Sequence, residues 1–239
     1  MKILGVECTA SPVSVALFED GGIKAEYFLN QKITHSQTLL PMCESVLELS
    51  RVSLDEIDAF AVTAGPGSFT GVRIGISAVK GIAQPLDKPC VPVSVLEAMA
   101  YGMTASDCIV CAVMDARCKQ VYNALFEIEN GLVKRLCEDR ALMIEELGSE
   151  LMKIESDHPE TPIFAVGDGA ELFYGSVKDK LPTLKKAPEH LKWQRASGVC
   201  MAAEKLLSSG KTVSAKELLP VYLRLPQAER ELKAKQNIK

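Results

Sequence analysis

The segment from Asp58 to Gly75 constrains the fold more than any other part of the chain. Its first eight residues, DAFAVTAG, form a largely apolar run that predicts a buried β-strand, and the run breaks at the turn Gly65-Pro66-Gly67. The helix expected next carries glycine at two successive turns, Gly71 and Gly75. Such a loop brings the backbone close to a neighbour, either an anion at the helix N-terminus or the backbone of another helix.

The spacing of the glycines gives little support to a phosphate site. A P-loop needs four residues between its first glycine and a Gly-Lys-Ser/Thr triplet, and neither Gly65 nor Gly67 meets that spacing. The dinucleotide-binding fingerprint fails by one position, because Thr70 stands where its third glycine would be. A helix packed closely on a neighbour is the better interpretation.

Residues 71–83 divide into three stripes at helical spacing. The small stripe is Gly71, Gly75 and Ala78, the apolar stripe is Val72, Ile76, Val79 and Ala83, and the polar stripe is Arg73, Ser77 and Lys80. A preceding helix near residues 36–49 has its own apolar stripe, with Ser36 or Thr38 as its cap and Pro41 in its first turn. These helices either pack on their own sheet or meet another chain, and both can hold on different faces.

Composition describes a chain that folds on its own in a reducing compartment. The 239 residues are 47% hydrophobic and 5% aromatic, which is ordinary for an α/β protein, and the net charge of −4 arises in residues 1–105. No apolar run approaches the ~20 residues of a membrane span. Glu7 follows the start too soon for a signal peptide. We therefore expect a cytoplasmic protein with no membrane contact.

Eight cysteines are scattered through apolar segments and predict reduced thiols, with Cys43, Cys90, Cys137 and Cys200 as small core residues. Cys108 and Cys111 form a lone Cys-x-x-Cys within a predicted strand, so their side chains should point to opposite faces. A zinc site would need a second pair. We predict no metal and no bound cofactor.

The two halves of the chain open alike. Strand, turn and strand over residues 3–18 end at Gly21-Gly22, and the same pattern over residues 109–126 ends at Asn130-Gly131. The repeat predicts a duplicated α/β fold. We expect an N-terminal lobe over residues 1–105 and a C-terminal lobe over 106–224 whose last helix, near Ala196 to Ser208, can pack back on the first lobe. A basic, flexible tail is expected over 225–239.

Several segments together resemble one family. They are Ala64 to Gly75, His35-Ser36 with Leu39-Leu40-Pro41, Ser94 to Ala98, Asp115-Ala116-Arg117 with Val121-Tyr122, Gly167-Asp168-Gly169 and Pro220 to Arg224. In that order they resemble the bacterial TsaB family, from Met1 to about Arg224. The resemblance implies a two-lobed ASKHA fold, like that of actin and Hsp70, in which each lobe is a ribonuclease-H-like mixed sheet with helices.

The resemblance also implies a function. TsaB proteins are non-catalytic partners of TsaD, which transfers a threonylcarbamoyl group to adenosine 37 of tRNAs that read codons beginning with A, and the ATPase TsaE joins the pair. We accordingly expect TsaD, TsaE, tRNA through the complex, and a second copy of this chain as partners. The predicted contact residues are His35, Leu39, Met42, Cys43, Val46, Leu47, Phe69, Val72, Arg73, Ile76, Val79 and Lys80. A charge at Val72 or Ile76 should then abolish binding to TsaD and leave a folded monomer.

The alternative is an ATP-binding or peptidase-like enzyme of the actin-like superfamily. The histidines are His35, His158 and His190, and no two are four residues apart, so the metal-binding histidine pair of TsaD-type proteins cannot form. There is no Gly-x-Ser-x-Gly. Actin-like ATPases usually place an aspartate before the phosphate turn, where this chain has Glu7, and its Cys8-to-Ser11 turn lacks glycine. Tight ATP binding is therefore disfavoured.

Overall fold

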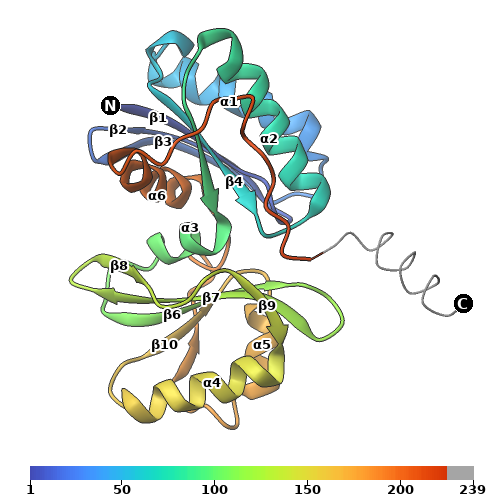
Figure 1. Ribbon diagram of the computed structural model, residues 1–239, viewed down its shortest axis with the longest axis vertical. Helices are drawn as coiled ribbons and strands as arrows, with labels where there is room; N and C mark the ends of the chain where they lie inside the picture. The colour runs from blue at the N-terminus through green and yellow to red at the C-terminus, as the bar shows by residue number, and fades with distance from the viewer. Residues whose placement is uncertain (225–239) are drawn as a thin grey trace, which may run out of the picture.

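The computed structural model describes residues 1–224, which form two lobes stacked along the long axis of the molecule (Figure 1). The first lobe contains one five-stranded sheet in the order β3-β2-β1-β4-β5. Its strands are β1 (Lys2–Glu7), β2 (Val13–Glu19), β3 (Gly22–Leu29), β4 (Ala59–Gly65) and β5 (Cys90–Ser94). β1 pairs antiparallel with β2 and parallel with β4, so this is a mixed sheet. The predicted basic tail lies outside the described residues.

The second sheet repeats this order. Its path is β11-β10-β6-β7-β8, and β9 also pairs with β7. The strands are β6 (Cys108–Asp115), β7 (Gln120–Glu129), β8 (Leu132–Arg135), β9 (Arg140–Met143), β10 (Ile163–Val166) and β11 (Leu184–Lys186). β6 pairs antiparallel with β7 and parallel with β10, as β1 does with β2 and β4. The predicted duplicated α/β fold is confirmed.

Equivalent turns follow the second strand of each lobe. Asp20 and Gly21 have φ values of 48° and 79°, and Asn130 and Gly131 have values of 52° and 75°. Positive φ at two successive residues is the geometry of the tight turn that suits the twist of a hairpin, and Asp-Gly and Asn-Gly adopt it readily. These sequences therefore fix where each hairpin reverses.

Two helices cover one face of the first sheet, α1 (His35–Ser50) and α2 (Phe69–Ala83). Short 3₁₀ turns at Leu54–Glu56 and Gln84–Leu86 precede β4 and β5. α1 begins earlier than the capping prediction: Thr34 is its N-cap and makes no side-chain cap bond, so Pro41 lies in the second turn. The earlier start is held by His35, whose Nε2 donates to the Ala10 carbonyl at 2.8 Å.

The last helix of each half packs against the sheet of the other half. α6 (Ala196–Ser208) lies on the free face of the first sheet, where Val199, Cys200 and Ala203 join one buried cluster with strand residues of that sheet. α3 (Val95–Tyr101) contributes Leu96 and Met99 to the core beneath β6 and β7. Because α3 and α6 also pack on each other at the waist of the molecule, the two cores are joined there (Figure 1).

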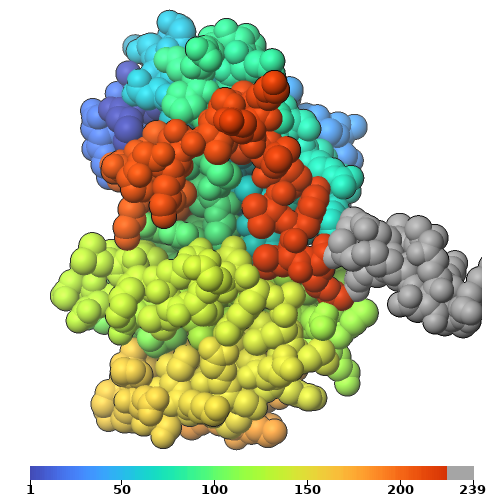
Figure 2. All heavy atoms as spheres, viewed as in Figure 1, coloured from blue at the N-terminus to red at the C-terminus, as the bar shows by residue number. Residues whose placement is uncertain are grey.

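The second lobe carries two further helices, α4 (Ile144–Asp157) and α5 (Ala170–Val177), on the outer face of its sheet. After α6, residues 211–224 run back along α2 without regular structure and end at the second lobe, a segment that we call the strap (Figures 1 and 2). No helix within residues 1–224 is long and apolar enough to cross a membrane.

Candidate functional site

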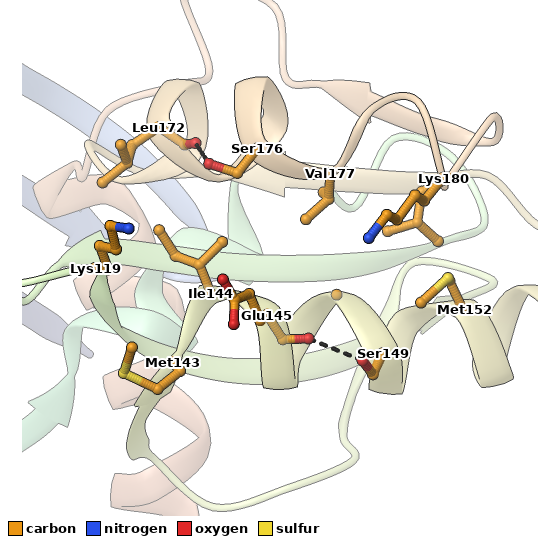
Figure 3. Close-up of a pocket in the computed structure, with 12 residues that line it drawn as sticks. Lys119, Met143, Ile144, Glu145, Ser149, Met152, Leu172, Ser176, Val177 and Lys180 are labelled. Carbon is orange, nitrogen blue, oxygen red and sulfur yellow. Dashed lines mark hydrogen bonds between the residues drawn. The ribbon is translucent and has the colours of Figure 1, made fainter.

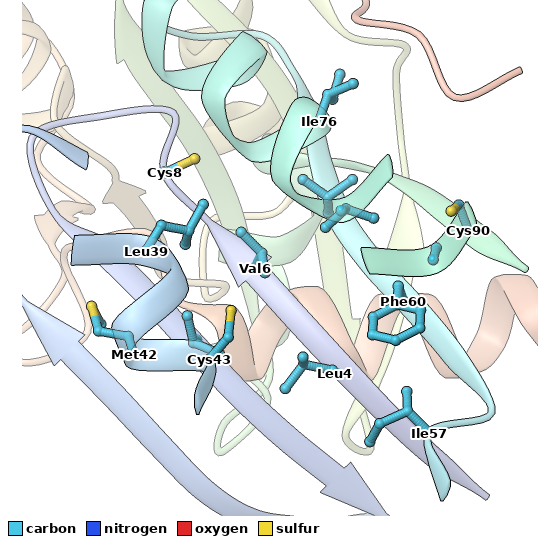
Figure 4. Packing of buried hydrophobic residues seen from close by; sticks show 14 of the residues in the cluster. Leu4, Val6, Cys8, Leu39, Met42, Cys43, Ile57, Phe60, Ile76 and Cys90 are labelled. Carbon is cyan, nitrogen blue, oxygen red and sulfur yellow. The ribbon is translucent and has the colours of Figure 1, made fainter. Parts of the chain in front are cut away.

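The apolar stripe of α1 faces the interior of its own lobe. Leu39, Met42, Cys43, Val46 and Leu47 are all buried and belong to the cluster that also contains Leu4, Val6 and Phe60 of the first sheet. Figure 4 shows Leu39, Met42 and Cys43 pointing toward these strands. The expectation that this stripe lies exposed for a partner is wrong, because the five side chains are core residues of the monomer.

The apolar stripe of α2 is buried in the same cluster. Val72 and Val79 are each 1% exposed and Ile76 is 5% exposed, and all three pack with residues of the first sheet and of α1. A charge at Val72 would therefore be buried in the lobe core. This burial speaks against the expectation that such a variant stays a folded monomer and loses only its partner.

The glycine stripe of α2 also serves the monomer. A Cβ atom at Gly71 would collide with the carbonyl oxygen of Cys8, and one at Gly75 would lie 2.8 Å from the Cys8 Sγ atom. Cys8 follows β1 directly, so the two glycines let α2 approach the end of that strand. Of the two uses considered for these glycines, close packing on the helix's own sheet is the one observed.

Three other predicted contact residues lie on the surface of α2, where the strap engages them. The Phe69 ring stacks on that of Tyr222 with centroids 4.7 Å apart, and the Arg73 Nε atom donates to the Tyr222 hydroxyl at 2.8 Å. Lys80 donates through Nζ to the carbonyl oxygens of Lys216 and Leu218, both at 3.1 Å. His35 is half-buried at the start of α1. Arg73 stays exposed, and Phe69 and Lys80 are half-buried as well.

What α1 and α2 do expose is a groove between them. Its volume is about 580 Å³. It is lined by Ser36, Leu39, Leu40, Phe69, Thr70, Arg73, Ile74, Ser77 and Ala78. Leu40, on the α1 wall of the groove, is 50% exposed. Arg73 is the single charged residue of the lining. A groove with apolar walls, small polar rim residues and one cation is a plausible surface for a protein partner.

Sequence reasoning missed Leu40 and Ile74 as groove residues and the strap as the cover of α2. Leu40 sits one position beyond Leu39, and Ile74 sits one position before Gly75; both neighbours are buried members of the stripes, so periodicity assigns Leu40 and Ile74 to the helix flank. Tyr222 lies in a segment with no helical or strand period, so its position against α2 could not be read from spacing. The Pro-Val-Tyr-Leu-Arg sequence at residues 220–224 carries the family resemblance, but nothing in it indicates what it contacts.

A second hollow of about 490 Å³ lies between the lobes. The first lobe contributes Thr9, Ser11 and Ser68, and the second contributes Asp115 and Asp168. Behind this wall Glu7 is fully buried, and its Oε1 atom accepts two hydrogen bonds of 2.6 Å from the backbone N–H and the hydroxyl of Thr9. Burial raises the pKa of the Glu7 carboxyl, because a charge there would lose its hydration.

Asp168 lies on the opposite wall, directly after β10. The Gln194 Nε2 atom donates to its Oδ1 atom at 3.3 Å. Burial, helped by the nearby charge of Asp115, raises the pKa of Asp168 to about 6. Asp168 lies in the short turn between the end of β10 at Val166 and the start of α5 at Ala170.

A third hollow, of about 490 Å³, lies between α4 and α5 of the second lobe (Figure 3). Lys119 and Lys180 lie at its two ends, with the apolar residues Ile144 and Val177 between them. The hydroxyl groups of Ser149 and Ser176 donate back to carbonyl oxygens of their own helices, each at 2.9 Å. The polar groups inside this groove are therefore partly satisfied within the lobe.

The Cys-x-x-Cys pair is divided between two cores, as strand geometry predicts. Cys108 packs with α3 and Cys111 packs with the cluster beneath α4 and α5. Burial raises the pKa of the Cys108 thiol to about 11 and that of Cys111 further, so neither forms a thiolate readily. Of the predicted core fillers, Cys43, Cys90 and Cys200 are buried and Cys137 is half-buried.

Comparison with solved structures identifies the fold class of the protein. An uncharacterised Pseudomonas aeruginosa protein with similarity to the peptidase YeaZ superposes with a TM-score of 0.77 and 28% identity over 93% of this chain and 99% of that chain. The ROK hexokinase of Thermus thermophilus superposes with a TM-score of 0.51 over 88% and 100% of the two chains, and its 11% identity shows the fold alone. The molecule is thus a two-lobed protein of the ASKHA fold.

Sequence relatives narrow this class. Residues 22–232 match the family model of TsaD, the tRNA N6-adenosine threonylcarbamoyltransferase. The tRNA threonylcarbamoyladenosine biosynthesis protein TsaB of Escherichia coli is 33% identical over 99% of this chain and 100% of its own length. TsaB of Bacillus subtilis is 32% identical over 96% of each chain. The protein belongs to the TsaB family.

The residues around the hollow between the lobes do not fit the phosphates of a bound nucleotide. The N–H and hydroxyl of Thr9 are both engaged by Glu7, and the Ser68 N–H at the start of α2 donates to the Thr9 carbonyl at 2.8 Å. The two loops that would cradle phosphates therefore bond to each other. On the other wall, Asp115 and Asp168 would repel an anion.

Proposed function

We propose that this protein acts in the biosynthesis of tRNA threonylcarbamoyladenosine as a non-catalytic partner of a TsaD-type transferase. Membership of the TsaB family supports the pathway. The observation that carries the docking site is the apolar groove of about 580 Å³ between α1 and α2, with Leu40 and Ile74 on its walls. The contact is made by these outer flanks, because the stripes first predicted to make it are core.

The relation between the two families supports a particular geometry. The family model that matches residues 22–232 is that of the transferase, so α1, α2 and the strap all fall within the shared region. Two related subunits can pair equivalent faces about an approximate two-fold axis, in the way identical subunits do in an isologous dimer. The groove between α1 and α2 would then receive the equivalent helices of the transferase.

The non-catalytic part of the proposal is supported by where the three histidines lie. His35 begins α1 and is bonded to Ala10, His158 is the C-cap of α4, and His190 is exposed in the loop before α6. They lie on separate elements, so they do not form the pair that a metal-dependent transferase site needs. The catalytic group transfer is accordingly assigned to the partner.

The same groove also explains the other assemblies that we propose. Without the transferase, a second copy of this chain would occupy it, so homodimer and heterodimer compete for one surface. The pair of subunits then recruits the TsaE ATPase and presents tRNA to the transferase. In this arrangement the protein works by completing a complex.

The test is binding of purified protein to its cognate transferase by titration calorimetry. Leu40→Asp should weaken binding at least 100-fold, because a carboxylate in the groove would be desolvated without a partner. Leu132→Asp is the matched control, since Leu132 is 72% exposed on β8 of the other lobe. Both variants should unfold at the wild-type denaturant concentration. Unchanged binding by folded Leu40→Asp would place the interface elsewhere.

Reconstituted tRNA modification tests the role. The transferase and the TsaE ATPase should modify tRNA only when this protein is added, and Leu40→Asp should not restore activity. Modification at the full rate without the protein would overturn the proposal. Dilution from high concentration should dissociate the homodimer, and added transferase should convert it to the heterodimer, as size-exclusion chromatography with light scattering would show.

A further inference from the structure

The strap passes the edge of the groove between α1 and α2 and continues over the glycine turn to the second lobe. The backbone N–H of Val221 donates to the Ala64 carbonyl at 2.7 Å, at the end of β4. A Cβ atom on Gly65 would collide with the Val221 carbonyl oxygen, so the strap passes directly over the glycine turn. Beyond it, Arg224 donates through Nη1 to the Ala116 carbonyl of the second lobe. The strap is therefore fixed on both sides of Tyr222.

Tyr222 is rigid and only partly covered. Its ring stacks on Phe69 and its hydroxyl accepts from Arg73, and both of these residues line the groove. The side chain nevertheless remains 39% exposed. An aromatic ring that is held in place before binding loses little conformational entropy when a partner covers it, which is why tyrosine and arginine are common at energetic centres of interfaces. The groove wall thus continues onto the strap.

Arg73 has donors left over. Its Nε atom is used by Tyr222, and its guanidinium carbon lies 5.7 Å from the centroid of that ring. The terminal nitrogens donate to no residue within 1–224, and the side chain is in no salt bridge with that part of the chain. The fork of a guanidinium held in this way suits a carboxylate approaching from outside.

Building on the proposed function, we propose that Tyr222 and Arg73 form a second recognition point of the docking surface, for a carboxylate carried by the transferase subunit. The partner would place an apolar side chain in the groove beside Leu40 and a glutamate or aspartate against the terminal nitrogens of Arg73. Tyr222 holds the guanidinium in position through its hydroxyl and its ring. The strap is then part of the binding surface as well as a link between the lobes.

The test is the affinity of purified variants for the cognate transferase at low and high salt. Arg73→Ala should weaken binding about 30-fold at 50 mM salt, and the loss should shrink several-fold at 500 mM, because a screened ion pair contributes less. Tyr222→Ala should weaken binding about tenfold. Tyr222→Phe keeps the stacked ring and loses the acceptor for Arg73, so a loss of about threefold is expected. Lys24→Ala, an exposed cation on β3, is the control and should bind like wild type.

Arg224→Ala tests whether Tyr222 contacts the partner directly or acts only by keeping the strap ordered. This variant loosens the strap at the second lobe without changing the surface of Tyr222 or Arg73, and it should bind within twofold of wild type. Losses as large as those of Tyr222→Ala would overturn the direct contact. Arg73→Ala and Tyr222→Ala binding like wild type, while Leu40→Asp does not bind, would overturn this inference and leave the proposed function standing. Failure of the wild type to bind would overturn the proposed function itself.

Discussion

The helix pairs α1/α2 and α4/α5 occupy equivalent places in the two lobes, yet they present different surfaces. Each pair covers one face of a sheet with the same strand order. The groove of α1/α2 has Arg73 as its one charged lining residue and is bordered by the strap, whereas that of α4/α5 is closed at its ends by Lys119 and Lys180 and also contains Glu145. Duplication preserved the way the helices pack inward. Their outward flanks diverged, and those flanks carry the proposed function.

The largest expected effect separates inward from outward positions on the first pair. Val72→Asp places a charge among apolar groups where Val72 is 1% exposed, and we expect a loss of about 4 kcal/mol or more in the free energy of unfolding. Leu40→Asp changes a half-exposed side chain, and we expect a change within about 0.5 kcal/mol. Urea unfolding followed by circular dichroism measures both. Equal stabilities would mean that α2 does not pack as described.

Glycine-to-alanine substitutions compare the two helix pairs at the positions where a helix packs most closely on its neighbour. Gly71→Ala in α2 forces the new methyl group onto the backbone of Cys8, and a loss of about 2 kcal/mol is expected. In α4, Gly148→Ala brings a methyl group 3.0 Å from the Val177 Cγ1 atom, a side chain that can yield, and the better helix propensity of alanine offsets the crowding.

The control for these substitutions is Gly81→Ala, also in α2, where nothing lies within 4 Å of the added atom. A gain of about 0.5–1 kcal/mol is expected there from helix propensity alone. Thermal or urea unfolding of the three variants should therefore rank Gly81→Ala first, Gly148→Ala near wild type, and Gly71→Ala last. A wild-type value for Gly71→Ala would contradict the close approach of α2 to the end of β1.

The buried carboxyl of Asp168, in the wall of the hollow between the lobes, should make stability depend on pH. The folded-state pKa of Asp168 is raised to about 6 from 3.8, so ionisation disfavours folding: the stabilising effect of its neutral form is complete below about pH 4 and is lost as the pH rises through 6. Asp168→Asn should therefore raise the free energy of unfolding by about 3 kcal/mol at pH 7.5 and change it little at pH 4. A gain of equal size at both values would show that the ionisation of Asp168 is not its cause.

The smallest expected effect concerns the second pair. Lys180→Glu reverses a charge at the end of the groove between α4 and α5, far from the proposed docking surface. Affinity for the transferase should stay within twofold of wild type in the calorimetric titration. A loss of tenfold or more would show that the transferase contacts both helix pairs, and that the difference between their surfaces does not assign the partner.

The sequence was a good guide to the fold because its signals are local. Apolar runs, turn residues such as Gly21-Gly22 and Asn130-Gly131, and helical spacing predicted the hairpins, the duplication and α6. The same signals could not assign the candidate site. An apolar stripe such as Val72, Ile76 and Val79 has the same period whether it faces its own sheet or another protein, and only the packed structure distinguishes these cases.

The strap shows the other limit. Tyr222 lies 149 residues from Arg73 in sequence, and no periodicity connects an irregular segment with the helix that it crosses. The stripe pattern placed Arg73 on the polar face of α2, but its contact with Tyr222 depends on where α6 ends and on the path of the chain beyond it. Such contacts follow from topology, which single-sequence patterns do not contain.

The crossed placement of α3 and α6 bears on how the chain acquires its shape during synthesis. The underside of the first sheet is covered by a helix that the ribosome produces more than a hundred residues after β5. Until that helix emerges, β1, β4 and β5 have one bare apolar side, which is a target for chaperones. A gene fragment that encodes residues 1–195 should therefore yield insoluble protein. Co-expression with a second fragment that encodes residues 196–239 should restore its solubility.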